Sequence, residues 1–283
     1  MIGIIDVGGG MKGIYSSGLY DYLMDKGIYF DYNLGVSSGT ANLITYVAKQ
    51  RGRTYRFYHD YSFHRKYFSV TNFITNRGSL LGLDYIYSEI CNSDGIDPLD
   101  YEAIEKADCI YKAAATVAKT GKVHYFDKSD FKKDDYTVLK ACCALPAASR
   151  SVKFNGVRYF DGGVANPVPY KKAFEDGCDK IVVVLYYPKD YRKPPMSSLA
   201  KILLAKYPEV VKGTMTTNER YNADVDVLIE LEKQGKVFIV APEELSEIKT
   251  LTRDKGLFEK MYQAGYKDGK KIEDFLKSEN AVK

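Results

Sequence analysis

Tryptophan is absent from this chain of 283 residues, and histidine occurs only three times. His59, His64 and His124 do not pair in the spacing of metal ligands. Cysteine is also scarce, and its five positions form no C-x-x-C pair: Cys91, Cys109, Cys142, Cys143 and Cys178. We therefore expect neither a metal site nor a disulfide framework, but free thiols in a reducing compartment.

Long apolar runs are missing as well. No stretch reaches the roughly 20 residues that a membrane-spanning helix needs, and the chain begins without the basic stretch and long apolar core of a signal peptide. The 41 lysines and arginines are nearly balanced by 37 acidic residues and form no block, which disfavours a nucleic-acid partner. These absences predict a soluble, cytoplasmic protein.

The remaining composition is that of an ordinary globular protein, with 45% hydrophobic and 28% charged residues. The length suits one large α/β domain or two small ones. Because no repeat, low-complexity segment or linker divides the chain, we predict a single domain over residues 1–283. Its motifs lie within about residues 1–187, and residues 188–283 are expected to be mostly helical with one further strand.

Hydrophobic periodicity predicts a layered α/β fold. Helical spacing is found at residues 15–23, which Gly27 ends, and again at residues 44–48 and 136–143. Strands are predicted over residues 2–7, 28–30, 34–36, 108–117, 122–127, 158–160, 180–186 and 236–240. The early β-α-β-α order favours a three-layer α/β/α sandwich with a mainly parallel sheet, to which residues 108–127 add a strand pair that turns at Thr120-Gly121.

Gly35-Val36-Ser37-Ser38-Gly39 is a G-x-S-x-G sequence between a predicted strand and a predicted helix. Small residues two before and two after the serine allow a strained turn that lifts its hydroxyl clear of the sheet. A helix N-cap, in which Ser37 or Ser38 accepts from free backbone N–H groups, explains the same residues. The motif alone does not separate a nucleophile from a cap.

Gly8-Gly9-Gly10-Met11-Lys12-Gly13 lies between the first strand and the first helix. Gly8, Gly10 and Gly13 fit the G-x-G-x-x-G of a dinucleotide site. A second interpretation pairs Asp6-Val7-Gly8-Gly9-Gly10 with Asp161-Gly162-Gly163 as the two phosphate loops of a sugar-kinase-like or actin-like nucleotide site, although that site needs a hairpin where this sequence turns helical. As a third function, its backbone N–H groups and the following helix N-terminus stabilise an oxyanion.

Asp161-Gly162-Gly163 follows a predicted strand, so its aspartate lies at a sheet edge around which the backbone can fold. Taken by itself, an ordinary Asp-Gly turn is the simpler explanation.

In this order, the three motifs resemble those of the patatin-like phospholipases. The family's oxyanion loop G-G-G-x-[KR]-G is matched by Gly8 to Gly13 with Lys12 at the basic position, its elbow by Gly35 to Gly39, and its D-G-[GA] motif by Asp161 to Gly163. Ala141 to Pro146 is similar to the family's A-S-x-A-x-P block, with Cys142 in place of serine. Asn166 and Pro169 follow as in the family, and the resemblance covers about two-thirds of the chain.

The resemblance implies a patatin-like fold in which Ser37 is the nucleophile and Asp161 its only catalytic partner. It implies oxyanion donors at Gly8, Gly9 and Gly10, and supporting roles for Lys12, Gly13, Gly35, Ser38, Gly39, Gly162 and Gly163. A Ser-His-Asp hydrolase carries its histidine late in the chain, whereas none follows His124 here, which agrees with a two-residue mechanism. Asp161 must then act as the base itself, so we expect it to be partly buried with a raised pKa.

The expected reaction is hydrolysis of a carboxylic ester through an acyl-Ser37 intermediate, on a phospholipid, lysophospholipid or acylglycerol, without cofactor or metal. Two alternatives stay open: a nucleotide-binding enzyme that uses Gly8 to Gly13, and a catalytically silent regulator that keeps the fold. The sequence does not predict the oligomeric state.

Residues 51–68 interleave five basic residues with aromatic rings. We favour a helix with a packed aromatic face and a solvated basic face. The alternative is a flap that makes transient contact with a membrane surface and gives the protein a peripheral membrane position.

Overall fold

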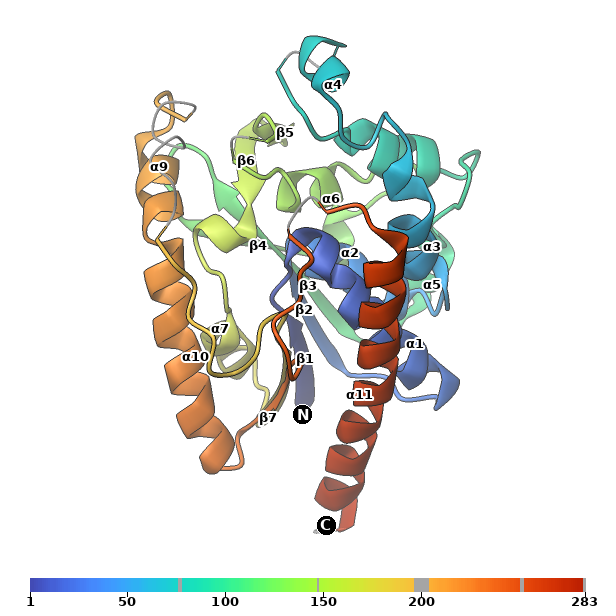
Figure 1. The fold of residues 1–283 in the computed structure, drawn as a ribbon, viewed down its shortest axis with the longest axis vertical. Coiled ribbons are helices and arrows are strands. Elements are labelled where there is room, and N and C mark those ends of the chain that lie inside the picture. The colour runs from blue at the N-terminus through green and yellow to red at the C-terminus, as the bar shows by residue number, and fades with distance from the viewer. Residues whose placement is uncertain (76–77, 147, 196–203, 250–251, 282–283) are drawn as a thin grey trace.

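A single mixed sheet forms the centre of the molecule (Figure 1). The structure is a computed structural model that describes residues 1–75, 78–146, 148–195, 204–249 and 252–281. Its eight strands are β1 (Ile2–Asp6), β2 (Tyr32–Val36), β3 (Ile110–Val117), β4 (Val123–Asp127), β5 (Val152–Phe154), β6 (Val157–Asp161), β7 (Lys180–Val184) and β8 (Val237–Val240). They are ordered β5-β6-β3-β2-β1-β7-β8, with β4 also paired to β3.

Neighbouring strands from β3 through β2, β1 and β7 to β8 are parallel, whereas β4, β5 and β6 pair in the antiparallel sense. The mainly parallel sheet predicted from the sequence is therefore confirmed. The antiparallel pair β3 and β4 was also predicted, and it turns at Gly121, whose N–H donates to the Val117 carbonyl.

Helices cover both faces of the sheet. They are α1 (Ile14–Asp25), α2 (Ser38–Val47), α3 (Arg53–His59), α4 (Val70–Thr75), α5 (Tyr101–Lys106), α6 (Thr137–Cys142), α7 (Tyr170–Glu175), α9 (Pro208–Met215), α10 (Thr217–Lys233) and α11 (Lys255–Ala281). α1 and α2 pack on one face of the sheet, and α7 and α10 pack on the other, against β7 and β8 (Figure 1). With α11 packed on α1, the result is the expected three-layer sandwich (Figure 1).

The core lies on both sides of the central strands. Almost every residue of β1, β2 and β7 is buried, as expected for central parallel strands that are covered on both faces. The carboxyl ends of β1 and β2 lead directly into the glycine loop, which continues as the 3₁₀ turn η1 (Gly10–Gly13), and into α2. The buried centre of the sheet thus carries the candidate site.

The predicted strand at residues 28–30 is wrong. This segment closes the C-terminal end of α1: the Ile28 N–H donates to the Leu23 carbonyl at 2.9 Å, and the Gly27 N–H donates to the Met24 carbonyl at 3.0 Å. With Gly27 at φ +65°, this is a Schellman motif. β2 begins two residues later, at Tyr32.

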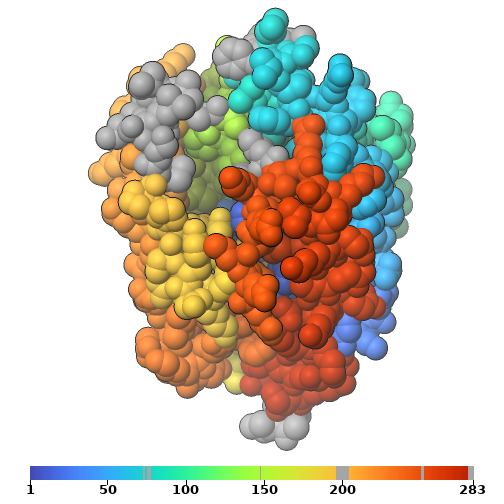
Figure 2. All heavy atoms as spheres, in the orientation of Figure 1, coloured from blue at the N-terminus to red at the C-terminus, as the bar shows by residue number. Residues whose placement is uncertain are grey.

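The longest helix, α11, has 27 residues and forms much of the face drawn in Figure 2, where it is orange to red. Polar side chains join it to α1. The Tyr15 hydroxyl donates to Asp268 at 2.7 Å, and the Tyr262 hydroxyl donates to Asp21 at 2.9 Å. Neither α11 nor any other helix within the described ranges is both long and apolar enough to cross a membrane.

Candidate active site

Ser37 and Asp161 are brought together by strands that share one edge of β3. β4 occupies the other edge, where it pairs with residues 115–116. β6 pairs with the same two residues, so it must lie on the edge that β2 also uses. There β2 ends at Val36 opposite Ala114, and β6 ends at Asp161 opposite the next residue of β3. The two strands meet end to end, and Ser37 directly follows Val36.

Ser37 occupies a strained turn between β2 and α2. Its backbone has φ 55° and ψ −130°, a conformation that residues other than glycine rarely adopt. A Cβ atom on Gly35 would lie 2.4 Å from the Thr40 Cα, and one on Gly39 would lie 2.3 Å from Asp6 Oδ1. Both flanking positions therefore require glycine, as the geometry of a nucleophile elbow demands.

Asp161 is 3% exposed and sits beside the Ser37 side chain. One carboxyl oxygen accepts from the Gly163 N–H at 2.9 Å. The other is buried without a hydrogen-bond partner of normal geometry among the described residues, so the Ser37 hydroxyl contacts the carboxyl without completing a full bond. Burial raises the pKa of Asp161 to about 6, against the opposing effects of the Ser37 hydroxyl, the Gly163 N–H and the Lys193 ammonium.

The glycine loop packs against the elbow, and two of its N–H groups are already engaged. The Gly8 N–H donates to Asp6 Oδ1, and the Gly9 N–H donates to Ser38 Oγ, each at 3.0 Å. In this structure, the N–H groups of Gly8 and Gly9 therefore both have an acceptor within the protein. The Gly10 N–H makes no hydrogen bond to any described residue, and Gly10 lines the same cavity as Ser37.

A fully buried carboxylate, Asp6, supports the loop. Besides the Gly8 N–H, it accepts hydrogen bonds from the hydroxyls of Tyr186 at 2.6 Å and Tyr20 at 3.0 Å. Burial raises the pKa of Asp6, while these donors lower it. In the sequence, Asp6 has a predicted role only as part of a phosphate loop. The signal for its structural role was an acidic residue at the end of an otherwise apolar strand.

The other supporting residues of the motifs also have close neighbours. A Cβ atom on Gly13 would lie 2.1 Å from the Tyr58 hydroxyl, and one on Gly162 would lie 2.3 Å from the Ala114 carbonyl oxygen. In the block that precedes Asp161, the Ala144 carbonyl accepts from the Asp161 N–H at 2.9 Å. The neighbouring Cys143 Sγ donates to the Ser37 carbonyl at 3.3 Å. The block thus holds both Ser37 and Asp161.

Two lysines lie on the Asp161 side of the site. The Lys12 ammonium is 5.0 Å from the centroid of the Tyr187 ring, and the Lys193 ammonium is 5.2 Å from the same ring and 3.6 Å from that of Tyr221. Burial lowers the pKa of each lysine to about 8, and Lys12 contributes to the shift at Lys193. Neither forms an ion pair with a described carboxylate. No motif marks Lys193.

An apolar cavity of about 750 Å³, its open mouth included, adjoins Ser37. Gly10, Ser37 and Ser38 form part of its wall. Most of the remaining lining is aliphatic or aromatic: Ala41, Phe57, Tyr58, Tyr61, Tyr67, Leu81, Leu83, Ile86, Tyr87, Ile90 and Leu145. Its apolar lining suits a hydrocarbon chain.

None of the three histidines lines this cavity. His59 contacts Asp60 at 2.8 Å, His64 stacks on the Tyr85 ring, and His124 lies in β4. Within the described part of the chain, no three side chains of histidine, cysteine, aspartate or glutamate converge in a metal-binding arrangement. The site consists of a serine, a carboxyl group, backbone N–H groups and two lysines.

Residues 51–68 form α3 and the turns that follow it, and their basic side chains are mostly paired. Arg51 pairs with Asp25, whereas Arg53 and Arg56 both pair with Asp97. The prediction that the basic side chains of this segment are solvated is wrong for Arg53. Its side chain is buried, and its charge is paired there with the buried Asp97 carboxylate.

Comparison with known proteins gives two family matches and distant relatives. A family described as patatin-like phospholipase matches residues 7–174, and a domain of unknown function (DUF6363) matches residues 207–278. The uncharacterized protein YjjU of Escherichia coli K12 is 27% identical over 209 residues, which are 69% of this chain and 54% of YjjU. The chain thus spans about half the length of this curated relative.

Among solved structures, VipD from Legionella pneumophila aligns with 96% of this chain and with 66% of its own, at 12% identity and a TM-score of 0.48. The patatin-like match covers more than half of the chain and contains the glycine loop, the Ser37 elbow and Asp161. This chain therefore belongs to the patatin-like phospholipase family.

Proposed function

We propose that this protein is a serine-dependent lipid acyl hydrolase, of the phospholipase A or lysophospholipase type, with Ser37 and Asp161 as a catalytic dyad. One observation carries the proposal: a serine on a strained elbow lies beside a buried carboxyl group whose pKa is raised to about 6. Such a carboxylate is a stronger base than an exposed aspartate, yet it is still mostly ionised at neutral pH.

In the proposed reaction, Asp161 takes the proton from the Ser37 hydroxyl as the serine oxygen attacks the ester carbonyl. The proton then passes to the departing alcohol, which leaves an acyl-Ser37 intermediate. Water hydrolyses this intermediate with Asp161 again as the base. The loose contact between Ser37 and Asp161 is compatible with this role, because catalytic hydrogen bonds often tighten only when substrate is bound.

Two backbone groups are suited to stabilise the oxyanion. The Gly10 N–H is free of described acceptors. The second is the N–H of Ser38, the residue after the nucleophile, which is the usual second donor at an elbow. Ser38 is also the first residue of α2, so the N-terminal end of the helix dipole favours negative charge at the same place.

The surroundings of the dyad support a phospholipid substrate. The apolar cavity suits the acyl chain. On the Asp161 side, Lys12 and Lys193 offer positive charge, and neither forms an ion pair with a described carboxylate. An anionic headgroup would satisfy both ammonium groups, whereas a neutral acylglycerol would leave them unpaired.

The nucleotide-binding alternative fits this geometry less well. A phosphate loop needs several free N–H groups, but those of Gly8 and Gly9 are engaged by Asp6 and Ser38. A silent regulator has no need of a strained serine or a buried carboxyl group with a raised pKa.

The test combines covalent labelling with hydrolysis. A fluorophosphonate probe should label the wild type and not Ser37→Ala, and vesicles containing an anionic phospholipid should release fatty acid with the wild type only. Circular dichroism of Ser37→Ala provides the control for folding. Equal labelling of both proteins would refute the assignment of Ser37, and no release from any lipid would refute the proposed activity.

A further inference from the structure

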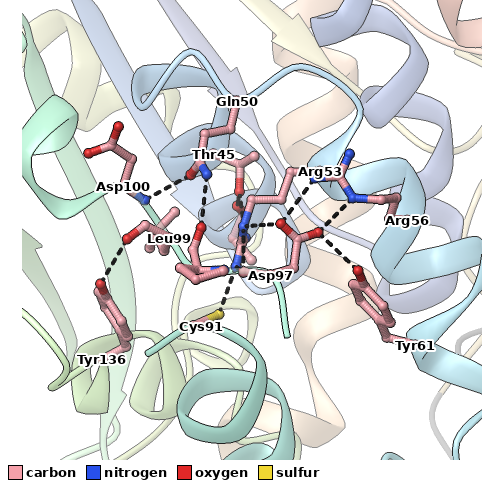
Figure 3. Close-up of polar contacts among 12 residues, drawn as sticks. Thr45, Gln50, Arg53, Arg56, Tyr61, Cys91, Asp97, Leu99, Asp100 and Tyr136 are labelled. Carbon is pink, nitrogen blue, oxygen red and sulfur yellow. Dashed lines mark hydrogen bonds and ion pairs between the residues drawn. The ribbon is translucent and has the colours of Figure 1, made fainter. Parts of the chain in front are cut away.

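A buried ion pair forms part of the wall of the apolar cavity. Arg53 and Asp97 both line it, and each is 8% exposed. Charged side chains are rare in a site for hydrocarbon, because a buried charge must find partners for all its polar atoms. Figure 3 shows that these partners come from three separate segments, around Thr45, Arg53 and Asp97.

The guanidinium group of Arg53 is fixed from several sides. Its Nε and Nη2 donate to the Asp97 backbone carbonyl at 3.1 and 2.7 Å, and Nη2 also donates to Cys91 Sγ at 3.1 Å. Its Nη1 lies 3.4 Å from Thr45 Oγ1, and Nε lies 3.7 Å from the Asp97 carboxylate. The group cannot swing away without losing these contacts together.

The polar contacts continue outward from the cavity. The Asp97 carboxylate accepts from Arg56 at 2.7 and 3.0 Å and from the Tyr61 hydroxyl at 3.2 Å (Figure 3). The Arg56 side chain is 44% exposed. Arg53, Asp97 and Arg56 therefore form a continuous polar network, here called the barrier, that leads from the cavity wall to solvent.

Helix α2 gives the distance between Ser37 and this barrier. Ser38, Ala41, Asn42 and Thr45 all line the cavity, and their spacing puts them on one face of the helix. Thr45 lies eight positions after Ser37, a rise of about 12 Å at about 1.5 Å per residue. Because Thr45 contacts Arg53, the barrier lies about two helical turns from the nucleophile.

We propose that the Arg53–Asp97 pair is the floor of the acyl site and selects medium-chain acyl groups. This inference rests on the proposed function. With carbon–carbon bonds of about 1.5 Å, an extended alkyl chain advances about 1.25 Å per bond, so about ten carbons fill the available length. A longer chain would have to displace a guanidinium and a carboxylate that are buried together, and would leave their charges uncompensated.

The direct test is the chain-length profile of the wild type. p-Nitrophenyl butanoate, octanoate, decanoate, dodecanoate and hexadecanoate serve as substrates. The value of kcat/KM should peak at octanoate or decanoate and fall at least about tenfold at hexadecanoate. A wild type that hydrolyses hexadecanoate as well as octanoate would overturn the proposal.

Arg53→Ala tests the floor itself, because Asp97 keeps Arg56 and Tyr61 as partners. The ratio of hexadecanoate to octanoate hydrolysis should rise about tenfold. Arg51→Ala is the matched control: it removes an arginine of the same segment that pairs with Asp25 outside the cavity, and its profile should equal that of the wild type. A folded Arg53→Ala protein with the wild-type profile would contradict the assignment.

Ala41→Leu tests the same geometry with the floor intact. Ala41 lines the cavity one turn from Ser37, so a larger side chain there should move the optimum toward butanoate. This variant and the wild-type profile decide the question if Arg53→Ala does not fold, and an unchanged optimum in Ala41→Leu would overturn the proposed path of the chain. Failure of the proposed function looks different, since no ester of any length would then be hydrolysed above the Ser37→Ala background.

Discussion

At the scale of single residues, Asp161 combines burial with a charge that the proposed chemistry requires. Replacing it by asparagine keeps the acceptor for the Gly163 N–H but removes the base. We expect activity to fall by roughly 10²–10⁴-fold. Wild-type activity should decline on acidification through a pKa of about 6, because the protonated carboxyl group cannot accept a proton. Ester hydrolysis measured across pH tests both, and an active Asp161→Asn protein would refute the dyad.

The same residue predicts an effect on stability. The pKa of Asp161 is raised from 3.8 to about 6 in the folded state, so the fold binds this proton more tightly than the unfolded chain does. The contribution of Asp161 to the free energy of unfolding is therefore most favourable at low pH, and it is lost as pH rises through about 6. Asp161→Asn should therefore be more stable than the wild type at alkaline pH, by up to about 3 kcal/mol. Urea unfolding should show this gain shrink on acidification to about pH 4.

Ser38 offers a test of the contact between the glycine loop and the elbow. Its hydroxyl accepts from the Gly9 N–H, a bond that Ser38→Ala removes and Ser38→Thr can retain. We expect kcat to fall about tenfold in the alanine variant, far less than in Ser37→Ala, and to recover in the threonine variant. Equal rates for all three forms would mean that this bond does not position the loop.

At the scale of elements, the sequence predicted those features that depend on residues close together in the chain. The Ser37 elbow and the glycine loop depend on turns only a few residues long, and short motifs specify such turns. The partners of these turns are not local. Lys193 reaches the site from a segment without a motif. Arg53 was predicted to be solvated because its partner, Asp97, lies 44 residues away in the sequence. The strands β2 and β6, which bring Ser37 and Asp161 together, pair with the same edge of β3, and their register is set by residues far apart in the sequence.

The contact between α1 and α11 is close enough to be tested by one methyl group. A Cβ atom on Gly265 would lie 1.8 Å from the Tyr15 carbonyl oxygen, so Gly265→Ala must push the helices apart. We expect a loss of about 2–3 kcal/mol in the free energy of unfolding. Gly256→Ala, in the exposed first turn of the same helix, is the control and should be neutral or slightly stabilising. Similar effects of both substitutions would contradict the close packing.

At the scale of the whole molecule, we propose that residues 1–283 are one folding unit, although two separate families match its parts. β8 continues the sheet beyond β7, and α11 covers α1. A protein ending at residue 187 would expose the edge of β7 and the apolar side of α1, so it should not fold. Fluorescence and circular dichroism should report one coincident unfolding transition for the full chain. A truncated protein that folds and reacts with the fluorophosphonate would show two units instead.

The cavity beside Ser37 takes its parts from different stretches of the chain. The groups proposed for the chemistry lie within residues 8–39 and 161–163, whereas most of the apolar wall and both partners of its floor lie within residues 53–97. Substitutions in the second stretch can reshape the wall without disturbing the strands that align Ser37 with Asp161. In evolutionary terms, descendants can inherit one reaction and diverge in the lipids that they consume. A directed-evolution library confined to residues 53–97 is therefore the place to start changing that preference.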